Sequence, residues 1–189
     1  MPPVTFDQYS GYVEVDSELG KNLFYWHVTS QSDTPSSDPL LLWLNGGPGS
    51  SSIGYGFFTE HGPFRVASDG ETLELYNFSW NRDANIVYVE SPAGVGFSYS
   101  ENETGLSTND QVTAANMYTF IDKFLTELYP EYLNNSFYIV GESCKDYILL
   151  LRLKCAYNNN DSARFRSRRW SLRAHYGMGD LQESTLLDF

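Results

Sequence analysis

The chain has 189 residues, 41% of them apolar and 16% aromatic, and its formal net charge is −12. This length and composition favour one globular domain with a sizeable core over a disordered chain. The acidic balance argues against nucleic acid as the main partner. No apolar run approaches the roughly 18 residues that a membrane span needs. The short polar segment from Met1 to Asp7 predicts a mature N-terminus without a signal segment.

Apolar runs predict several strands. Tyr9–Val15 and Leu23–Thr29 flank a turn-forming segment, which predicts an antiparallel hairpin. The fully apolar runs Leu40–Leu44 and Ile86–Val89 are typical of buried parallel strands. Phe137–Val140 predicts one more strand.

One amphipathic helix is predicted between Asn109 and Tyr129, where apolar side chains recur at helical spacing. Thr108 to Gln111 offers a capping box at its start, and Pro130 prevents its continuation. The order of strands and helix favours the α/β class. It indicates the front half of an α/β-hydrolase fold, cut just after the strand that carries the nucleophile.

Ser143 is the predicted nucleophile, because Gly141-Glu142-Ser143 directly follows the last of these strands. In α/β-hydrolases the serine lies on a sharp turn after a strand, and a glycine-rich turn after an earlier strand supplies an oxyanion N–H. The segment from Asn45 to Ser52, which follows Leu40–Leu44, is such a turn. The acid and the histidine of the triad should come later in the chain.

None of the three histidines is assigned as the catalytic base. His27 lies in a strand pattern, His61 belongs to a motif with no catalytic role, and His175 follows an arginine cluster without a matching context. The active site is therefore expected to be incomplete. No His/Cys pairing at metal-ligand spacing precedes the serine, and serine chemistry needs neither a metal nor another cofactor.

Five motifs in order over residues 9–143 resemble those of the serine carboxypeptidases, peptidase family S10. They are Trp43-Leu44-Asn45-Gly46-Gly47-Pro48-Gly49, Glu60-His61-Gly62-Pro63-Phe64, Ser79-Trp80-Asn81, Glu90-Ser91-Pro92-Ala93-Gly94-Val95-Gly96-Phe97-Ser98-Tyr99 and Gly141-Glu142-Ser143. The segment Thr59–Phe64 looks most like the animal lysosomal members, the cathepsin A type.

The resemblance implies hydrolysis of the last peptide bond of a peptide or protein with a free C-terminus. It implies three catalytic groups: the Ser143 hydroxyl and, as oxyanion donors, the N–H groups of Gly47 and Cys144. The residues that it places at the substrate carboxylate are Asn45, Gly46, Glu60 and Glu142, with Trp43 beneath them.

Two ionised glutamates would repel the substrate carboxylate, so the pair must carry a proton to bind it. If Glu60 and Glu142 lie close together in a partly dry site, repulsion and desolvation let the pair share a proton and donate it. The resemblance and this argument predict an acidic optimum. The alternative is that the two are separate surface carboxylates.

Charge and cysteine content change after Ser143. Residues 1–143 carry 4 Lys and Arg against 19 Asp and Glu, and residues 144–189 carry 8 against 5. Cys144 and Cys155 are the only cysteines. The family continues Tyr-Ala-Gly after its serine, where this chain has Cys144-Lys145-Asp146. We therefore predict two parts: 1–143, the front of a carboxypeptidase domain, and 144–189, a tail from another reading frame or exon. A genuine divergent tail is the alternative.

Two functions stay open. In the first, the chain is the front half of a serine carboxypeptidase and is inactive alone, because the triad acid and histidine are missing. In the second, it is a non-catalytic binding or regulatory protein that keeps the pocket for a peptide C-terminus. The tail is expected to supply no strand beside Phe137–Val140, which disfavours the second function because the sheet edge would stay open.

Four Asn-x-Ser/Thr sequons suggest passage through a secretory pathway and a lysosomal or secreted location. They begin at Asn77, Asn102, Asn134 and Asn160. In a chain rich in Asn and Ser, chance is the alternative reading of such a short motif.

Overall fold

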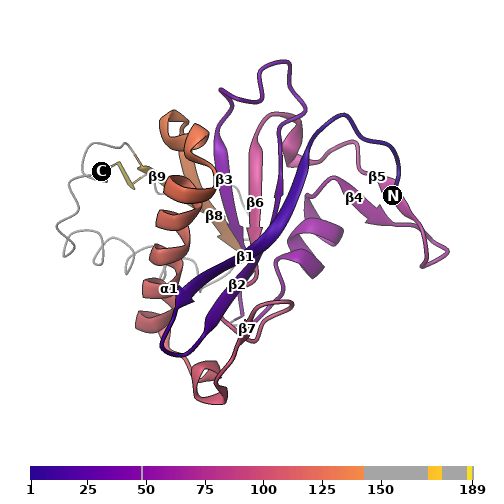
Figure 1. Ribbon diagram of the computed structural model, residues 1–189. Coiled ribbons are helices and arrows are strands. Elements are labelled where there is room, and N and C mark those ends of the chain that lie inside the picture. The colour runs from indigo at the N-terminus through magenta and orange to yellow at the C-terminus, as the bar shows by residue number, and fades with distance from the viewer. Residues whose placement is uncertain (48, 143–169, 176–186, 189) are drawn as a thin grey trace.

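The computed structural model describes residues 1–47, 49–142, 170–175 and 187–188. These residues form a mixed sheet with helices on both faces (Figure 1). Its strands follow the order β1-β2-β6-β3-β8-β9-β10, with β7 paired to β2. They are β1 (Gln8–Asp16), β2 (Lys21–Val28), β3 (Leu40–Leu44), β6 (Asn85–Val89), β7 (Tyr99–Ser100), β8 (Phe137–Glu142), β9 (Trp170–His175) and β10 (Leu187–Asp188).

The remaining elements are one small hairpin and several helices, mostly short. The hairpin consists of β4 (Phe64–Val66) and β5 (Leu73–Leu75). The helices are η1 (Ile53–Glu60), η2 (Trp80–Arg82), η3 (Glu103–Leu106), α1 (Asp110–Lys123), η4 (Phe124–Leu128) and η5 (Pro130–Asn134).

The predicted strands are confirmed. β1 and β2 pair antiparallel, and β2 pairs antiparallel with β6. The next pairs, β6 with β3 and β3 with β8, are parallel. The parallel strands are almost wholly apolar because helices cover both of their faces. The chain thus has the α/β fold with an antiparallel entry that its pattern predicts.

Each parallel strand divides its side chains between two core clusters. Leu40, Leu42 and Leu44 of β3 face α1, whereas Trp43 faces η1. β6 and β8 alternate in the same way, with Val87 on the α1 side and Tyr88 on the η1 side. This alternation follows from the two-residue period of a strand.

Helix α1 begins at a cap one residue later than the capping-box pattern predicts. Asn109 is the N-cap, and its side chain accepts a hydrogen bond from the Val112 N–H at 3.0 Å. The α-helix ends at Lys123 and continues through Leu128 as the π-helical turn η4, before Pro130. The predicted span is therefore helical, but in two geometries.

The prediction that the tail supplies no edge strand was wrong. β9 lies parallel to β8, with register from Phe137↔Trp170 to Glu142↔His175, and β10 pairs antiparallel with β9. The backbone groups on that side of β8 therefore have partners, which the tail's composition did not predict.

The carboxyl ends of β3, β6 and β8 meet at one edge of the sheet. The register Leu44↔Gly141 makes Asn45 and Glu142 neighbours, since each is the next residue of its strand or loop. Glu90 follows β6 at the same edge. In open parallel sheets this edge is where ligands bind.

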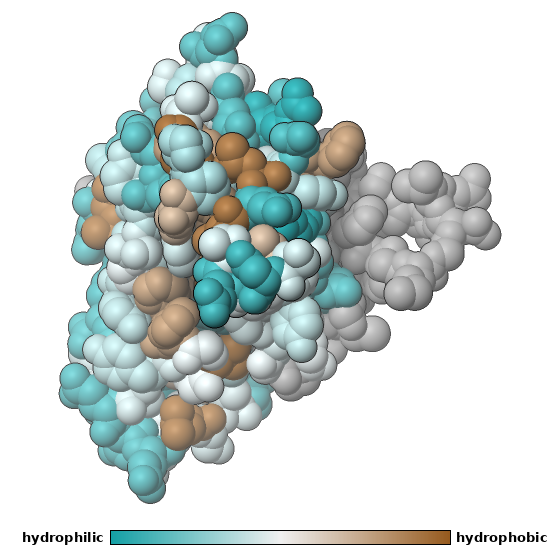
Figure 2. Space-filling view, turned by 90° about the vertical axis from the view of Figure 1, so that its right-hand side faces the viewer, coloured by the Kyte–Doolittle hydropathy of each residue, from teal (hydrophilic) through white to brown (hydrophobic). Residues whose placement is uncertain are grey.

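The surface combines polar area with small apolar patches. Figure 2 shows the hydrophobic residues on the face turned toward the viewer as separate groups amid hydrophilic ones. Exposed aromatic side chains in the described residues include Phe78, Phe97 and Tyr55. Within the described part of the chain, no helix is long and apolar enough to cross a membrane.

Candidate active site

The side chain of Asn45 is fixed in one orientation by two donors. Trp43 Nε1–H donates to Asn45 Oδ1 at 2.6 Å, and the Gly56 N–H donates to the same oxygen at 3.1 Å. The Asn45 N–H in turn donates to Ser52 Oγ at 3.1 Å. Because Oδ1 accepts two hydrogen bonds from the interior, the amide nitrogen must face outward.

That amide nitrogen joins two carboxylates. Asn45 Nδ2 donates to Glu60 Oε1 at 2.9 Å and to Glu142 Oε2 at 3.0 Å. Glu60 comes from the end of η1 and Glu142 from the end of β8. Glu60 is half-buried and Glu142 is exposed. The structure therefore brings together Trp43, Asn45 and both glutamates as the sequence predicted, and the reading of two separate surface carboxylates was wrong.

The environment of Glu60 favours its protonated form. Burial raises the pKa of the Glu60 carboxyl, and the nearby Glu142 charge raises it as well. The Asn45 hydrogen bond and the Arg65 guanidinium lower the same pKa, but the net direction is upward. A carboxyl of this kind keeps a proton to higher pH than an ordinary glutamate.

Gly56 is required beneath this cluster, although no sequence pattern pointed to it. A Cβ atom at Gly56 would lie 2.3 Å from Trp43 Nε1 and 2.9 Å from Asn45 Oδ1. Both distances are shorter than a carbon atom allows. The close approach of η1 to β3 lets the Gly56 N–H reach Asn45, and only glycine permits it.

Glu90 holds the loop that connects β3 to η1. Its carboxylate is only 1% exposed and accepts hydrogen bonds from Ser51 Oγ at 2.6 Å and the Ser52 N–H at 3.2 Å. Burial raises the pKa of Glu90, and the bonds from Ser51, Ser52 and Ile53 oppose that shift. A negative charge at the start of a helix is favourable. Sequence reasoning placed Glu90 in a motif but gave it no role.

The predicted oxyanion loop has an unusual backbone. Gly47 has φ +118°, and a Cβ there would lie 2.9 Å from the Gly49 nitrogen. Gly46 is buried, and its carbonyl accepts a hydrogen bond from the Ser50 N–H at 3.2 Å. Gly47 is exposed, as an oxyanion donor must be to meet a substrate. Ser143 and Cys144 lie outside the described residues.

His27 and His61 are both buried and neutral. His27 lies between the Ile86 carbonyl at 3.0 Å and the Tyr132 hydroxyl at 3.1 Å, and burial lowers its pKa to about 4. His61 is 3.1 Å from the Tyr88 hydroxyl, and burial lowers its pKa to about 3. Neither is placed to serve as a catalytic base. The backbone of His175 ends β9, opposite Glu142.

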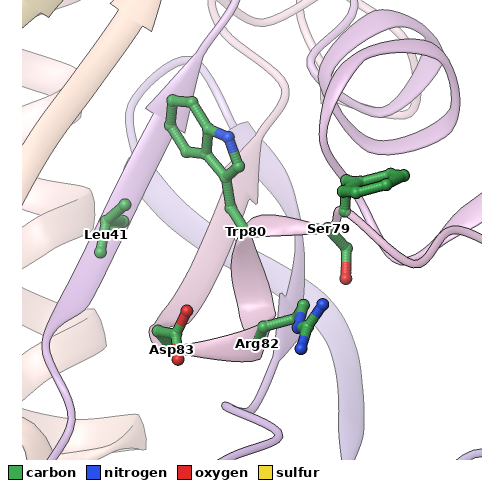
Figure 3. Close-up of a pocket in the computed structure, with 6 residues that line it drawn as sticks. Leu41, Ser79, Trp80, Arg82 and Asp83 are labelled. Carbon is green, nitrogen blue, oxygen red and sulfur yellow. The ribbon is translucent and has the colours of Figure 1, made fainter.

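An aromatic layer supports the cluster from below. Trp43 packs edge-on against His61, and Trp80 stacks on the same imidazole with ring centroids 4.2 Å apart. Trp80 also lines an open pocket of about 440 Å³. In Figure 3 its indole lies at one end of the pocket, with Arg82 and Asp83 at the other. The carboxylate cluster does not line this pocket, so the two are separate features.

The predicted glycosylation sites divide between exposed and undescribed positions. Asn77, Asn102 and Asn134 are exposed, as a glycosylated side chain must be. Asn102 also accepts hydrogen bonds from Thr104 at the start of η3. Asn160 lies outside the described residues. Among those described, no three His, Cys, Asp or Glu side chains are grouped so that they could hold a metal ion.

A glycine loop with positive φ angles after β3 and a later strand that leads in sequence into a serine are together typical of an α/β-hydrolase. The profile of one family in this class, described as serine carboxypeptidase, matches residues 1–146. The chain therefore belongs to the serine carboxypeptidase family, peptidase family S10.

The chain is similar to several known proteins. It is 50% identical over 159 residues to serine carboxypeptidase-like 27 of Arabidopsis thaliana, covering 83% of this chain and 34% of the relative. It is 49% identical over 140 residues to P-(S)-hydroxymandelonitrile lyase of Sorghum bicolor, covering 74% and 27%. A solved structure, the prohormone-processing carboxypeptidase Kex1 of Saccharomyces cerevisiae, superposes with a TM-score of 0.69 at 25% identity, covering 89% and 38%.

These similarities extend over only part of each relative. The chain spans about a third of the length of the curated relatives it matches. The α/β-hydrolase fold and the family are established. Both relatives named here are plant proteins, so the animal cathepsin A type stays a prediction from Thr59–Phe64.

Proposed function

We propose that the Asn45–Glu60–Glu142 cluster binds the free C-terminal carboxylate of a peptide, in a serine-type carboxypeptidase that works at acidic pH. The observation that carries this proposal is the single Asn45 amide that donates to both glutamates, at 2.9 and 3.0 Å. Two carboxylates held together at a surface attract a proton. A shared proton turns the pair into a donor for a third carboxylate.

The pH dependence of binding follows from the direction of the Glu60 pKa. Because burial and Glu142 raise that pKa, the proton stays on the pair at acidic pH. As pH rises through this raised pKa, the pair loses its proton, and the ionised glutamates then face the substrate carboxylate. Binding of a peptide carboxylate therefore weakens as pH increases.

The reaction proposed for the whole protein is attack of Ser143 on the last peptide bond. The N–H groups of Gly47 and Cys144 stabilise the oxyanion, and the exposed Gly47 with φ +118° supports this role. A catalytic base must come from outside the described residues, because His27 and His61 are buried and neutral. We propose that the 189-residue chain alone does not hydrolyse peptides.

The second candidate function is a binding or regulatory protein that keeps the carboxylate pocket without catalysis. The pairing of β9 with β8 supports it, since a covered edge reduces the tendency of a sheet to aggregate. The solubility of the 189-residue chain tests this second function. A monomer that unfolds cooperatively and binds peptide carboxylates supports the binding protein, and an insoluble product contradicts it.

Sequence identity does not choose between peptidase and lyase chemistry, since one relative is named a carboxypeptidase-like protein and another a lyase at 50% and 49% identity. Calorimetry does. The 189-residue chain is titrated at pH 5 and pH 8 with an N-blocked dipeptide that has a free carboxylate, and with its C-terminal amide. Loss of a charge-assisted hydrogen bond predicts that the amide binds about tenfold to a hundredfold more weakly at pH 5.

A variant pair sharpens this experiment. Glu142→Gln replaces a carboxylate of the cluster by a permanent amide donor, so binding of the acid should persist at pH 8. Glu127→Gln removes an exposed carboxylate from η4 and should leave binding and its pH dependence unchanged. Equal binding of the dipeptide acid and its amide would overturn the carboxylate site.

We also propose a secretory route and a tail of separate origin. The exposed sequons at Asn77, Asn102 and Asn134 support secreted or lysosomal delivery, and a mass shift removed by an endoglycosidase after secretion tests it.

The change at Cys144-Lys145-Asp146 supports a frame shift or alternative exon over 144–189. Sequencing the transcript across Ser143 tests this, because a dominant message that reads Tyr-Ala-Gly makes the tail a misread product.

A further inference from the structure

His61 has a buried nitrogen without a partner. The residue is 6% exposed, and its Nε2 atom makes no hydrogen bond within the described residues. The ring is enclosed by Trp43, Trp80 and Tyr88. An unpaired polar atom in such a place destabilises the fold, which suggests that it has a partner in another state of the site.

The neighbouring Tyr88 determines which nitrogen carries the proton. Burial raises the pKa of Tyr88 well above its usual value, so its hydroxyl keeps its hydrogen. Among the described residues the hydroxyl has one hydrogen-bond partner, His61 Nδ1 at 3.1 Å. A buried hydroxyl with a single described partner is best satisfied by donating to it, which makes Nδ1 the acceptor. Because a neutral imidazole has a single N–H, that N–H lies on Nε2.

The Nε2–H group faces Glu60. Nε2 lies 4.0 Å from Glu60 Oε2, about 1 Å beyond an ordinary hydrogen bond. The other oxygen, Oε1, already accepts from Asn45. Since the Glu60 side chain is 30% exposed, a small rotation about its side-chain bonds closes the gap without moving the buried ring.

We propose that His61 is a positioning residue of the carboxylate site, whose Nε2–H donates to Glu60 Oε2 when Glu60 is ionised. Glu60 is then held by two neutral donors, Asn45 on one oxygen and His61 on the other. A role in packing alone would need no particular tautomer. The buried Tyr88 hydroxyl, which fixes the tautomer, distinguishes the proposal from packing.

The consequence for Glu60 depends on all charged groups around it. Arg65 donates to the Glu60 backbone carbonyl and favours the ionised carboxylate. Glu142, on the far side of Asn45, opposes ionisation, and Tyr88 is uncharged. A donor to the ionised form favours ionisation. His61 thus adds to Arg65 and sets the pH at which Glu60 loses its proton.

Nuclear magnetic resonance of the 189-residue chain tests the inference without any peptide. Nitrogen-15 shifts of the histidine rings report the tautomer, and the carboxyl carbon-13 shift of Glu60 reports its titration. Two variants of similar size form a matched pair: His61→Met has no donor and His61→Gln keeps one. We expect the Nε2–H tautomer in the natural chain, and a Glu60 midpoint higher by about half to one pH unit in His61→Met only.

Each outcome of these experiments either supports or overturns the inference. An Nδ1–H tautomer in the natural chain, or equal Glu60 midpoints in the two variants, overturns the inference. If His61→Met does not fold, Tyr88→Phe replaces it: loss of the hydroxyl should populate the Nδ1–H tautomer, and an unchanged tautomer contradicts the role of Tyr88.

The effect on substrate rests on the proposed function, and its readout is distinct. If the cluster binds carboxylates, His61→Met should bind the dipeptide acid up to a higher pH than the natural chain does. If no variant binds the dipeptide, the proposed function fails, and the tautomer and titration still decide the role of His61.

Discussion

Among the residues whose burial the structure describes, each face of the sheet buries one histidine, and the two are bonded differently. On the α1 face His27 uses both ring nitrogens, with the Ile86 carbonyl and the Tyr132 hydroxyl. On the η1 face His61 uses Nδ1 alone and leaves Nε2 facing Glu60. The difference teaches that burial and a lowered pKa do not identify function. His27, whose two ring nitrogens both have hydrogen-bond partners, has a structural role. His61, whose Nε2 lacks a partner and lies near the Glu60 carboxylate, belongs to the site.

The largest expected effect comes from a substitution that removes packing on the α1 face of the sheet and leaves the carboxylate cluster intact. Phe120 is fully buried on α1 and packs against Tyr25 and Phe124. Phe120→Ala should lower the free energy of unfolding by about 3–5 kcal/mol, measured by urea denaturation. At low urea the folded fraction should bind the dipeptide with unchanged affinity. A loss below about 1 kcal/mol would contradict the core that the structure defines.

Acid should weaken the fold through His27. Burial lowers its pKa from 6.5 to about 4, so between these values the unfolded chain binds a proton that the folded chain does not. Stability present above pH 6.5 is therefore lost as pH falls toward 4, by roughly 3 kcal/mol.

Urea midpoints at pH 7 and pH 4.5 measure this loss, and His27→Gln should reduce it. The lowered pKa of His61 acts in the same direction, and the raised pKa values of Glu60 and Glu90 act in the opposite direction. Only the comparison between the variant and the natural chain therefore isolates His27. The same acid sensitivity in both would show that His27 is not its source.

Gly56→Ala tests the η1 face. The new methyl group would meet Trp43 Nε1 at 2.3 Å, so Trp43 or η1 must shift, at about 1–3 kcal/mol in stability. Because Asn45 is held by both Trp43 and Gly56, dipeptide binding should fall at least tenfold. Gly54→Ala, in the same helix but exposed, is the matched control and should bind normally.

The smallest effect concerns the cap of α1. Asn109→Ala removes the acceptor for the Val112 N–H and should lower stability by about 1 kcal/mol. Thr108→Ala should cost less, since the structure makes Asn109 and not Thr108 the cap. Equal losses at the two positions, measured by urea denaturation, would restore the capping-box prediction.

The sheet was predictable because its strands carry their own signal. β3, β6 and β8 are short apolar runs, and their order alone indicated the fold. η1 was not predicted, because Gly54 and Gly56 disfavour a helix by local propensity. The helix forms because Ile53 and Phe57 are buried in the core, with Phe57 packed against Phe64 of β4 and Tyr88 of β6.

The site was predictable only as far as its motifs reached. Asn45, Glu60 and Glu142 were expected together and lie together. Glu90, Ser52 and His61 gave no usable signal, because their roles arise from hydrogen bonds between segments distant in the sequence. Likewise β9 was missed, since the composition of the tail does not show which strand it pairs with.

The parallel pairing of β3 with β8 also sets when the site can form. The Asn45–Glu142 hydrogen bond spans 97 positions of sequence, whereas β3 can pair with β6 much sooner. During synthesis one edge of β3 must therefore wait, unpaired, until β8 leaves the ribosome. Contacts at such separation form late. The carboxylate cluster is thus completed in the same step that covers this open edge of β3 in the nascent chain.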